Sequence, residues 1–186
     1  MVDVMPLHRP GEGPPREIVF SEEEIAARVR QLAADISGVY REEDHLLVLG
    51  LLKGSFIFMA DLVRAITVPH QVDFLVASSY GAQKVSSGEV RLLYDPAASL
   101  EGRAVLLVED IVDSGTTLQR LLPRLQARGP ASLEVCALLH KRIDGGGPEP
   151  RWVGFDAPNL FLVGYGLDYA EDFRHLPYIA SLQGLA

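Results

Sequence analysis

The stretch from Val105 to Leu118 combines the residue types that bind a phosphorylated sugar. An apolar run is followed by two adjacent carboxylates, Glu109 and Asp110, and then by the polar turn Asp113–Thr117. A turn of Ser, Gly and Thr at the start of a helix presents backbone N–H groups and hydroxyls where the helix dipole favours a phosphate. Carboxylates accept hydrogen bonds from ribose hydroxyls and also suit a magnesium shell. The stretch therefore predicts a sugar-phosphate site.

This stretch has alternative interpretations. It lacks the Gly and Lys of a P-loop and the three glycines of a dinucleotide-binding turn, so these two phosphate-binding motifs are disfavoured. Asp113 and Ser114 could instead only cap the next helix, which is the usual role of such residues in a strand-to-helix loop. Motifs elsewhere in the sequence are needed to distinguish a helix cap from a phosphate-binding turn.

Apolar runs alternate with helical patterns along the chain. Helices are predicted after the capping box of Ser21 and Glu24, and at 56–66 and 117–126. Strands are predicted at 46–52, 72–79, 90–94, 105–108 and 133–139, and three of these runs are too continuously apolar to have a wet face. The alternation predicts one α/β domain with a mainly parallel sheet flanked by helices. In such a sheet ligands bind beyond the carboxyl ends of the strands, where the polar turn lies.

Both ends of the chain depart from this pattern. Residues 1–17 are rich in proline and glycine, and we interpret them as a flexible lead-in to a single domain over 18–186. The region from Trp152 to Tyr169 is rich in Phe, Gly and Tyr, and we expect it to form a small appended subdomain that covers the sheet edge.

Composition disfavours several kinds of partner. The formal net charge of −8 would repel nucleic acids and anionic membranes, so we expect neither. The single cysteine, Cys136, excludes an intramolecular disulfide and argues against a thiolate zinc site. No apolar stretch approaches the about eighteen residues of a membrane span, and a secretion signal is not apparent, so a cytoplasmic protein is expected.

Four stretches resemble, in order, the hypoxanthine-guanine branch of the type I phosphoribosyltransferases. The string at 105–118, Val-Leu-Leu-Val-Glu-Asp-Ile-Val-Asp-Ser-Gly-Thr-Thr-Leu, is similar to the family signature for phosphoribosyl pyrophosphate. The others are 51–62, 78–88 and 163–179, so the resemblance covers residues 18 to 182. It implies the type I fold, with a small hood subdomain built from N- and C-terminal segments. It also implies an enzyme that joins hypoxanthine or guanine to ribose 5-phosphate and releases pyrophosphate.

The resemblance implies that the signature holds the ribose 5-phosphate of the donor. Glu109 and Asp110 bind the ribose hydroxyls or their metal-bound waters, with Mg²⁺ as cofactor. The 5-phosphate lies against the turn formed by Ser114, Gly115, Thr116 and Thr117. Ser114 stands where relatives often carry threonine, a change that keeps the hydroxyl.

A second group of residues matches family positions around pyrophosphate. Lys53 and Gly54 match the pyrophosphate loop, in which we predict a cis peptide at Leu52–Lys53. Arg174 matches a further pyrophosphate contact, and Asp168 matches a carboxylate near a second magnesium ion.

A third group matches the positions that meet the purine. Asp113 matches the proposed general base at N7, and Lys141 matches the lysine at the 6-oxo group. A nucleophilic purine nitrogen must shed a proton to a nearby carboxylate, and a cation at O6 stabilises the charge that develops on the ring. Phe161 matches the aromatic residue that stacks on the base, and Leu162 matches one whose backbone meets the ring edge.

Ser79 and Tyr80 open a polar segment that is similar to the family's flexible lid, which would close to exclude water during reaction. The lid departs from its relatives at Ala82, Gln83 and Lys84, which leaves its kinetics open. Relatives form dimers or tetramers, so a homodimer or homotetramer is expected.

Two alternative functions remain open. One is a regulatory protein of the same fold that senses phosphoribosyl pyrophosphate, although such a sensor needs neither Lys53 nor Lys141. The other is an enzyme for adenine, xanthine or a pyrimidine. Lys141 can only donate, which favours a 6-oxopurine over 6-amino adenine.

Overall fold

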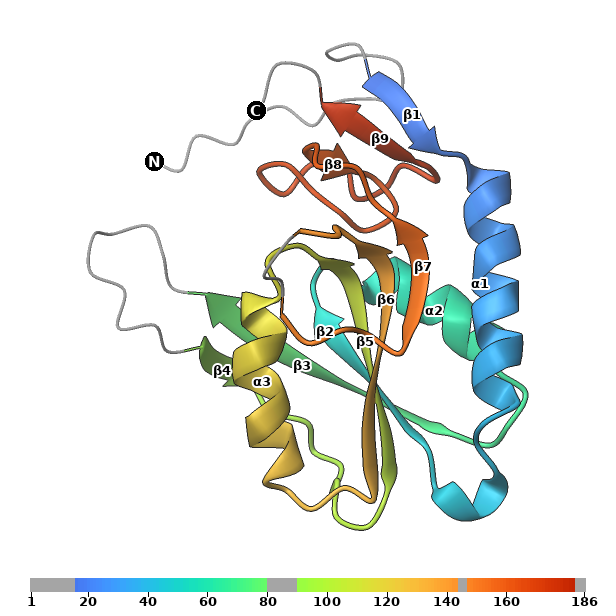
Figure 1. The fold of residues 1–186 in the computed structure, drawn as a ribbon, viewed down its shortest axis with the longest axis vertical. Helices are drawn as coiled ribbons and strands as arrows, with labels where there is room; N and C mark the ends of the chain where they lie inside the picture. The colour runs from blue at the N-terminus through green and yellow to red at the C-terminus, as the bar shows by residue number, and fades with distance from the viewer. Residues whose placement is uncertain (1–15, 80–89, 144–146, 183–186) are drawn as a thin grey trace.

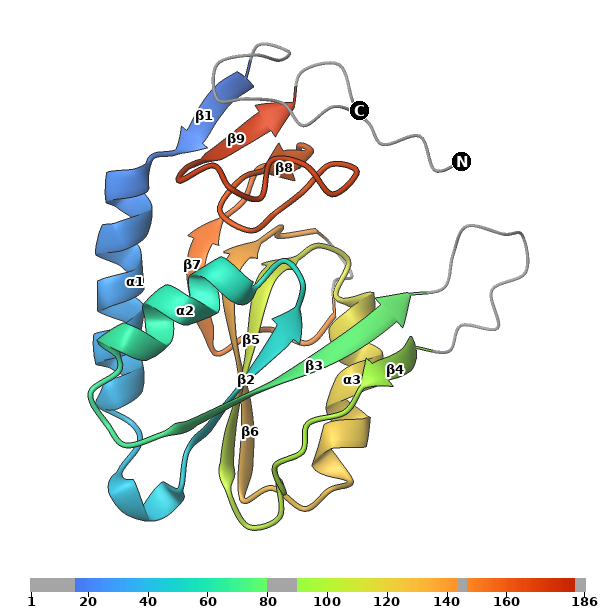
Figure 2. The ribbon, with the colours of Figure 1, turned by 180° about the vertical axis from the view of Figure 1, so that it is seen from behind.

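The computed structural model describes residues 16–79, 90–143 and 147–182, and Figures 1 and 2 show it from opposite sides. Its larger sheet has the strand order β4-β3-β2-β5-β6-β7. These strands are β2 (Leu47–Leu52), β3 (Gln71–Ser79), β4 (Val90–Tyr94), β5 (Ala104–Val112), β6 (Ser132–His140) and β7 (Trp152–Asp156). All their pairings are parallel except that of β4 with β3. The predicted α/β fold with a mainly parallel sheet is confirmed.

Alternate residues of the central strands face two different layers of helices. On one face Val48 and Leu106 pack with α1 (Glu22–Ser37) and α2 (Phe56–Ala65). On the other face Leu49 and Leu107 pack with α3 (Thr116–Gln126), and Figures 1 and 2 show α3 on the opposite side of the sheet from α1 and α2. Because both faces are covered, the strands contain uninterrupted apolar runs.

Helix α1 begins at the predicted capping box. Ser21 Oγ accepts a hydrogen bond from Glu24 N at 3.3 Å, and Ser21 N donates to Glu24 Oε2 at 2.8 Å. Arg28 then ties the helix to β7, since its Nε donates to Gly154 O and its Nη2 to Val153 O, each at 2.8 Å. The helix ends at Gly38, and a short 3-10 helix, η1 (Glu42–Asp44), leads into β2. No helix among the described residues is long and apolar enough to span a bilayer.

A small antiparallel sheet, which we call the hood, joins segments from both ends of the chain. Its order is β1-β9-β8, with β1 (Arg16–Phe20), β8 (Leu162–Val163) and β9 (Ile179–Leu182). Figure 1 shows the hood above the carboxyl ends of the large sheet. Arg16 and Glu17, which composition places in the lead-in, therefore belong to β1, because pairing with β9 stabilises a strand that local composition does not reveal. The rest of the lead-in lies outside the described residues.

The expectation that 152–169 forms one appended subdomain is wrong. Strand β7 extends the large sheet, where Cys136 pairs with Trp152 and Ala137 with Val153 in parallel register. Only the segment from β8 onward belongs to the hood. Strand β7 lies at the sheet edge and alternates between buried and part-exposed residues, so it lacks the apolar run that marks the inner strands.

Candidate active site

The turn after β5 forms a small pocket at the carboxyl end of the large sheet. Gly115 is the N-cap of α3 and has a φ of 69°. A Cβ added to Gly115 would lie 2.4 Å from Cα of Gly147, so the turn fits closely under the loop that follows β6. The hydroxyls of Ser114 and Thr116 lie 2.9 Å apart. The turn and Glu109 together line a pocket of about 80 Å³, into which the first N–H groups of α3 can donate.

Glu109 and Asp110 occupy consecutive positions on β5 in an environment that disfavours their charged forms. Glu109 is buried, and its Oε2 has no hydrogen-bond partner among the described residues. Burial, and next the charge of Asp110, raises the pKa of Glu109 well above its ordinary value of 4.5. Burial also raises the pKa of Asp110 to about 6. Hydroxyl donors or a cation would stabilise these carboxylates.

Asp113 and Lys141 form an ion pair where β5 and β6 end. Lys141 N donates to Val112 O at 2.9 Å, which holds the two strand ends together. Lys141 Nζ donates to Asp113 Oδ2, also at 2.9 Å. The side chain of Lys141 is 11% exposed and that of Asp113 is 56% exposed. Two of the four residues predicted to meet the purine therefore lie together, with the carboxylate accessible from solvent.

The loop after β2 meets both the acidic end of β5 and the hood. The Leu52–Lys53 peptide is cis, as predicted. Gly54 packs against Asp110, because an added Cβ would lie 1.6 Å from Asp110 Oδ2. Gly166 approaches Gly54, since a Cβ added to Gly166 would lie 2.1 Å from Gly54 O. At Gly166, which has a φ of 104° and faces backbone, only glycine allows this approach, whereas a Cβ on Gly54 would force the Asp110 carboxylate to move.

Charged residues extend this contact between the loop and the hood. Arg174 Nη1 donates to Gly166 O at 2.7 Å, and its Nη2 lies 2.8 Å from Asp168 Oδ1 and 3.2 Å from Glu171 Oε2. Lys53 Nζ donates to Glu171 Oε1 at 3.1 Å. The hydrogen bonds from Lys53, and next from Arg174, lower the pKa of Glu171. The sequence analysis does not identify Glu171 as a site residue. The only feature of the sequence that could have pointed to it is its position between Asp168 and Arg174, which are both predicted site residues.

The hood also presents two aromatic rings. Phe161 and Tyr169 contact edge to face, with ring centres 5.7 Å apart and ring planes at 89°. Both are exposed, by 41% and 39%. Phe161 O accepts a hydrogen bond from Leu182 N at 3.1 Å, which fixes its backbone to the end of β9, and the next residue, Leu162, is buried in β8. Tyr169 is a second aromatic residue of this surface that the sequence pattern does not single out.

The structure thus brings most of the predicted site residues into two groups. One contains Asp113, Lys141, Glu109 and the turn at 114–117; the other contains Lys53, Gly54, Asp110, Asp168 and Arg174. The adjacency of Glu109 and Asp110 joins them. Tyr80 lies outside the described residues, and Ser79 is described only by its backbone, which ends β3 opposite Val90.

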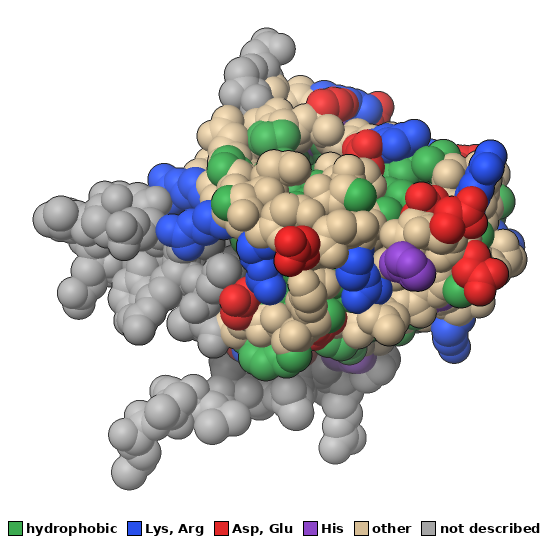
Figure 3. Space-filling view, turned by 90° about the horizontal axis from the view of Figure 1, so that it is seen from below, with side chains coloured by type: hydrophobic (Ala, Val, Ile, Leu, Met, Phe, Trp, Pro, Cys, Tyr) green, Lys and Arg blue, Asp and Glu red, His purple; other side chains and the backbone are tan. Residues whose placement is uncertain are grey.

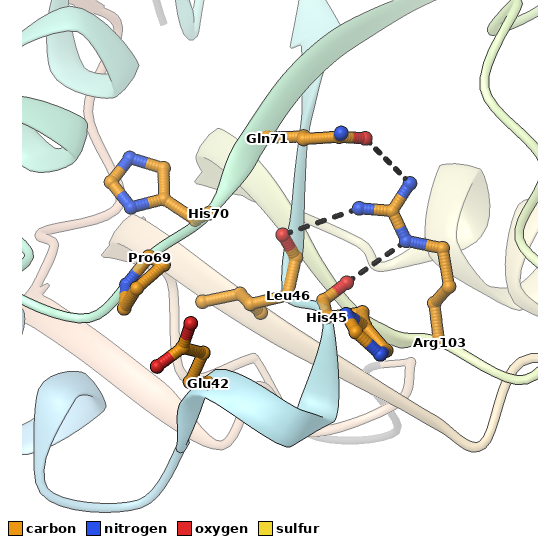
Figure 4. A pocket seen from close by; sticks show the side chains of 7 residues that line it. All are labelled: Glu42, His45, Leu46, Pro69, His70, Gln71 and Arg103. Carbon is orange, nitrogen blue, oxygen red and sulfur yellow. Dashed lines mark hydrogen bonds between the residues drawn. The ribbon is translucent and has the colours of Figure 1, made fainter.

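A larger pocket, of about 510 Å³, lies at the opposite end of the sheet, near the amino ends of β2 and β3. Figure 4 shows Arg103 bonded to the Gln71 side chain at 2.8 Å and to the carbonyl oxygens of His45 and Leu46 at 2.9 and 3.5 Å. This arginine ties strand ends together. In Figure 3, which views the molecule from below, acidic and basic side chains are interspersed among the described residues. The candidate active site is instead the carboxyl end of the sheet, where the predicted residues converge.

The chain resembles known proteins over most of its length. Residues 16–170 match the family model of the phosphoribosyl transferase domain. A hypoxanthine-guanine phosphoribosyltransferase of Dictyostelium discoideum is 45% identical over 172 residues, which cover 90% of this chain and 96% of that protein. A hypoxanthine phosphoribosyltransferase of Escherichia coli K12 is 45% identical over 169 residues, which cover 89% and 94%.

Solved structures of hypoxanthine phosphoribosyltransferases are also similar to this chain. The hypoxanthine phosphoribosyltransferase of Staphylococcus aureus superposes with a TM-score of 0.84 at 40% identity, covering 90% of this chain and 91% of that one. A point mutant of the Trypanosoma cruzi enzyme, solved as a ternary substrates complex, gives a TM-score of 0.83 at 40% identity and covers 92% and 96%.

Proposed function

Because this chain belongs to the hypoxanthine-guanine branch of the phosphoribosyltransferase family, we propose that it is a purine salvage enzyme. It transfers the 5-phosphoribosyl group from phosphoribosyl pyrophosphate to hypoxanthine or guanine, giving IMP or GMP and pyrophosphate. One observation supports this reaction above the others. A lysine that can only donate and a carboxylate that can accept a proton, Lys141 and Asp113, lie 2.9 Å apart beside a phosphate-binding turn.

The purine has to separate Lys141 from Asp113 when it binds. Lys141 Nζ then donates to the 6-oxo group, and Asp113 accepts the proton of N7 as N9 of the purine bonds to C1 of the ribose. The bond between C1 and the pyrophosphate oxygen breaks, and its electron pair leaves with pyrophosphate. The substrate thereby gives Lys141 an acceptor and Asp113 a donor, so neither group is left without a hydrogen-bond partner.

The donor is held from three sides in this proposal. Its 5-phosphate accepts hydrogen bonds from the N–H groups and hydroxyls of residues 114–117. Its ribose hydroxyls donate to Glu109 and Asp110, which gives the unpartnered Oε2 of Glu109 a partner. Lys53, the backbone of Gly54 and Arg174 bind pyrophosphate, the leaving group.

The same carboxylates fit Mg²⁺. No group of three or more His, Cys, Asp or Glu in the described part of the chain could hold a metal alone, and Mg²⁺ is usually bound by one or two carboxylates together with substrate phosphates. We propose that Glu109 and Asp110 would hold one Mg²⁺ ion and Asp168 a second; when bound, the ions would supply positive charge that stabilises the leaving pyrophosphate. Asp168 Oδ1 is occupied by Arg174 at 2.8 Å, so Asp168 must first lose part of this contact.

The hood completes the site in our proposal. The exposed ring of Phe161 stacks on the purine, and the backbone of Leu162 meets the ring edge. The segment that begins at Ser79 and Tyr80 closes over the reaction centre and excludes water, which would otherwise capture the activated ribose.

We place the enzyme in the cytoplasm, because a highly charged donor does not cross a bilayer unaided. We also propose a homodimer or homotetramer. Sedimentation equilibrium of the purified protein tests the assembly, and a monomer at micromolar concentration would contradict it.

The reaction is tested by incubating the purified protein with Mg²⁺, phosphoribosyl pyrophosphate and either hypoxanthine or guanine. Chromatography should detect IMP or GMP, with an equal amount of pyrophosphate released. No nucleotide from either base would overturn the proposal. Pyrophosphate without nucleotide would show hydrolysis of the donor instead.

A further inference from the structure

The carboxylate of Glu171 binds two cations that the proposed function assigns to pyrophosphate. Its Oε1 accepts from Lys53 Nζ at 3.1 Å, and its Oε2 accepts from Arg174 Nη2 at 3.2 Å. Cations that converge on the oxygens of one anion are a common way for proteins to bind phosphate groups. Here the anion at the point of convergence is a side chain of the protein.

The backbone of the hood turn places Glu171 at this point. Ala170 and Glu171 have φ values of 52° and 68°, and Glu171 N donates to Asp168 Oδ2 at 2.9 Å. Tyr169 N donates to Asp172 O at 3.2 Å, and Asp172 N donates to Tyr169 O at 3.0 Å. The turn is therefore closed by its own hydrogen bonds, and the position of Glu171 does not depend on its ion pairs alone.

The two cations differ in how firmly they are held. The side chain of Arg174 is 18% exposed and also contacts Gly166 O and Asp168 Oδ1, so we expect it to stay in place when Glu171 is removed. The side chains of Lys53 and Glu171 are each 65% exposed, so a ligand can reach both from solvent. An incoming anion can therefore displace the Glu171 carboxylate and find Arg174 already in place.

We propose that Glu171 is a positioning residue that competes with pyrophosphate for Lys53 and Arg174. It holds both cations while the donor is absent, releases them when the pyrophosphate group of the donor arrives, and takes them back as the product leaves. The inference rests on the proposed function, which assigns the two cations to pyrophosphate. Exposed ion pairs are weak, so the competition should reduce pyrophosphate affinity by only about two- to fivefold.

The test uses Glu171→Gln, which keeps the size of the side chain and removes its charge. Calorimetric titration with inorganic pyrophosphate and Mg²⁺ should give a Kd about two- to fivefold below that of the wild type. The KM for phosphoribosyl pyrophosphate should fall by a similar factor, and the KM for hypoxanthine should not change. Glu171→Asp restores the charge and should bring both values back toward those of the wild type.

Two further variants guard against a structural effect. Glu101→Gln removes the charge of an exposed glutamate before β5, at the far end of the sheet, and should match the wild type. Glu171→Asn removes the charge with a residue that tolerates positive φ, and it replaces Glu171→Gln if that protein does not fold.

A double variant tests whether Lys53 is one of the two cations. In a Lys53→Ala background, neutralising Glu171 should change the Kd for pyrophosphate by a smaller factor, because one of the two cations is missing.

Pyrophosphate binding that is unchanged or weaker in both neutral variants would overturn the competition. The titration needs neither a purine nor turnover, so its outcome is separate from that of the reaction. If nucleotide forms but the affinity does not shift, only the role of Glu171 fails. If the affinity shifts but no nucleotide forms, the reaction fails and the competition stands.

Discussion

Lys141 Nζ lies 2.9 Å from Asp113 Oδ2, so the two groups proposed to act on the purine already neutralise each other in the free protein. Lys141 is mostly buried, at 11% exposure, whereas Asp113 is 56% exposed and is the partner with more freedom to move. A base that opens the pair must offer an acceptor to Lys141 and a proton to Asp113. A 6-oxopurine offers both on the same edge of the base, at O6 and N7, whereas adenine offers an amino group in place of the acceptor.

Replacing Asp113 with asparagine should abolish most of the turnover. The amide keeps the shape of the carboxylate but cannot accept the N7 proton, and general-base catalysis contributes about 10²- to 10⁴-fold. We expect kcat to fall by at least about 100-fold, with little change in the KM for phosphoribosyl pyrophosphate. Initial rates of pyrophosphate release measure both values. Asp156→Asn is the control, and a kcat for Asp113→Asn close to the wild-type value would exclude this role.

Replacing Lys141 with alanine should weaken binding of the base. A hydrogen bond to a charged group contributes about 1.5–3 kcal/mol, so the KM for hypoxanthine should rise about 10- to 100-fold. The KM for phosphoribosyl pyrophosphate should change much less. Arg142→Ala, which removes an exposed cation at the next position, should leave both constants near those of the wild type. Equal losses for base and donor in Lys141→Ala would contradict the contact with O6.

Gly115→Ala should damage the turn that we propose binds the 5-phosphate of the donor. Gly115 has a φ of 69°, and the new Cβ would meet the backbone of Gly147 at 2.4 Å. Gly102→Ala is a matched control, because Gly102 has a φ of 71° with nothing within 4 Å of the added Cβ. Both variants should lose about 1–2 kcal/mol of stability from the positive φ. Only Gly115→Ala should raise the KM for the donor, and a similar KM increase in Gly102→Ala would mean that the turn is not specifically involved.

We expect the capping box of α1 to stabilise the folded protein in a pH-dependent way, through Glu24. Hydrogen bonds from the Ser21 backbone, and next from its side chain, lower the pKa of Glu24 below its ordinary value of 4.5. The capping contribution is therefore fully present above pH 4.5 and is lost as the pH falls through the lowered pKa. Glu24→Gln should lower the thermal midpoint at pH 7, and the difference from the wild type should shrink below pH 4.5. Glu23→Gln, measured in parallel, should show a smaller difference, and a constant gap for Glu24→Gln down to pH 3 would contradict the interpretation.

The inner strands of the fold could be predicted because burial on both faces leaves an unmistakable apolar run. The same physics explains why Asp113 and Lys141 meet: they follow β5 and β6, which are parallel neighbours, so their carboxyl ends lie side by side. Strands β1 and β7 were harder to recognise. Both lie at sheet edges, where fewer side chains are fully buried, so neither contains the long apolar run of the inner strands.

Glu171 shows what sequence patterns cannot provide. Its partner Lys53 is 118 positions away, and the contact depends on how the hood packs against the loop after β2. A single carboxylate in a turn has no periodicity from which this packing could be predicted. The close approaches of Gly54 to Asp110 and of Gly166 to Gly54 are equally invisible without the structure.

The most direct test of the Asp113–Lys141 pair is the rate of pyrophosphate release with hypoxanthine, guanine and adenine, each assayed at saturating phosphoribosyl pyrophosphate. A site built to bond a 6-oxo group should convert hypoxanthine or guanine to nucleotide at least about 100-fold faster than it converts adenine. Conversion of adenine at an equal or greater rate would contradict the account, because Lys141 would then not be selecting a base that carries an acceptor at position 6.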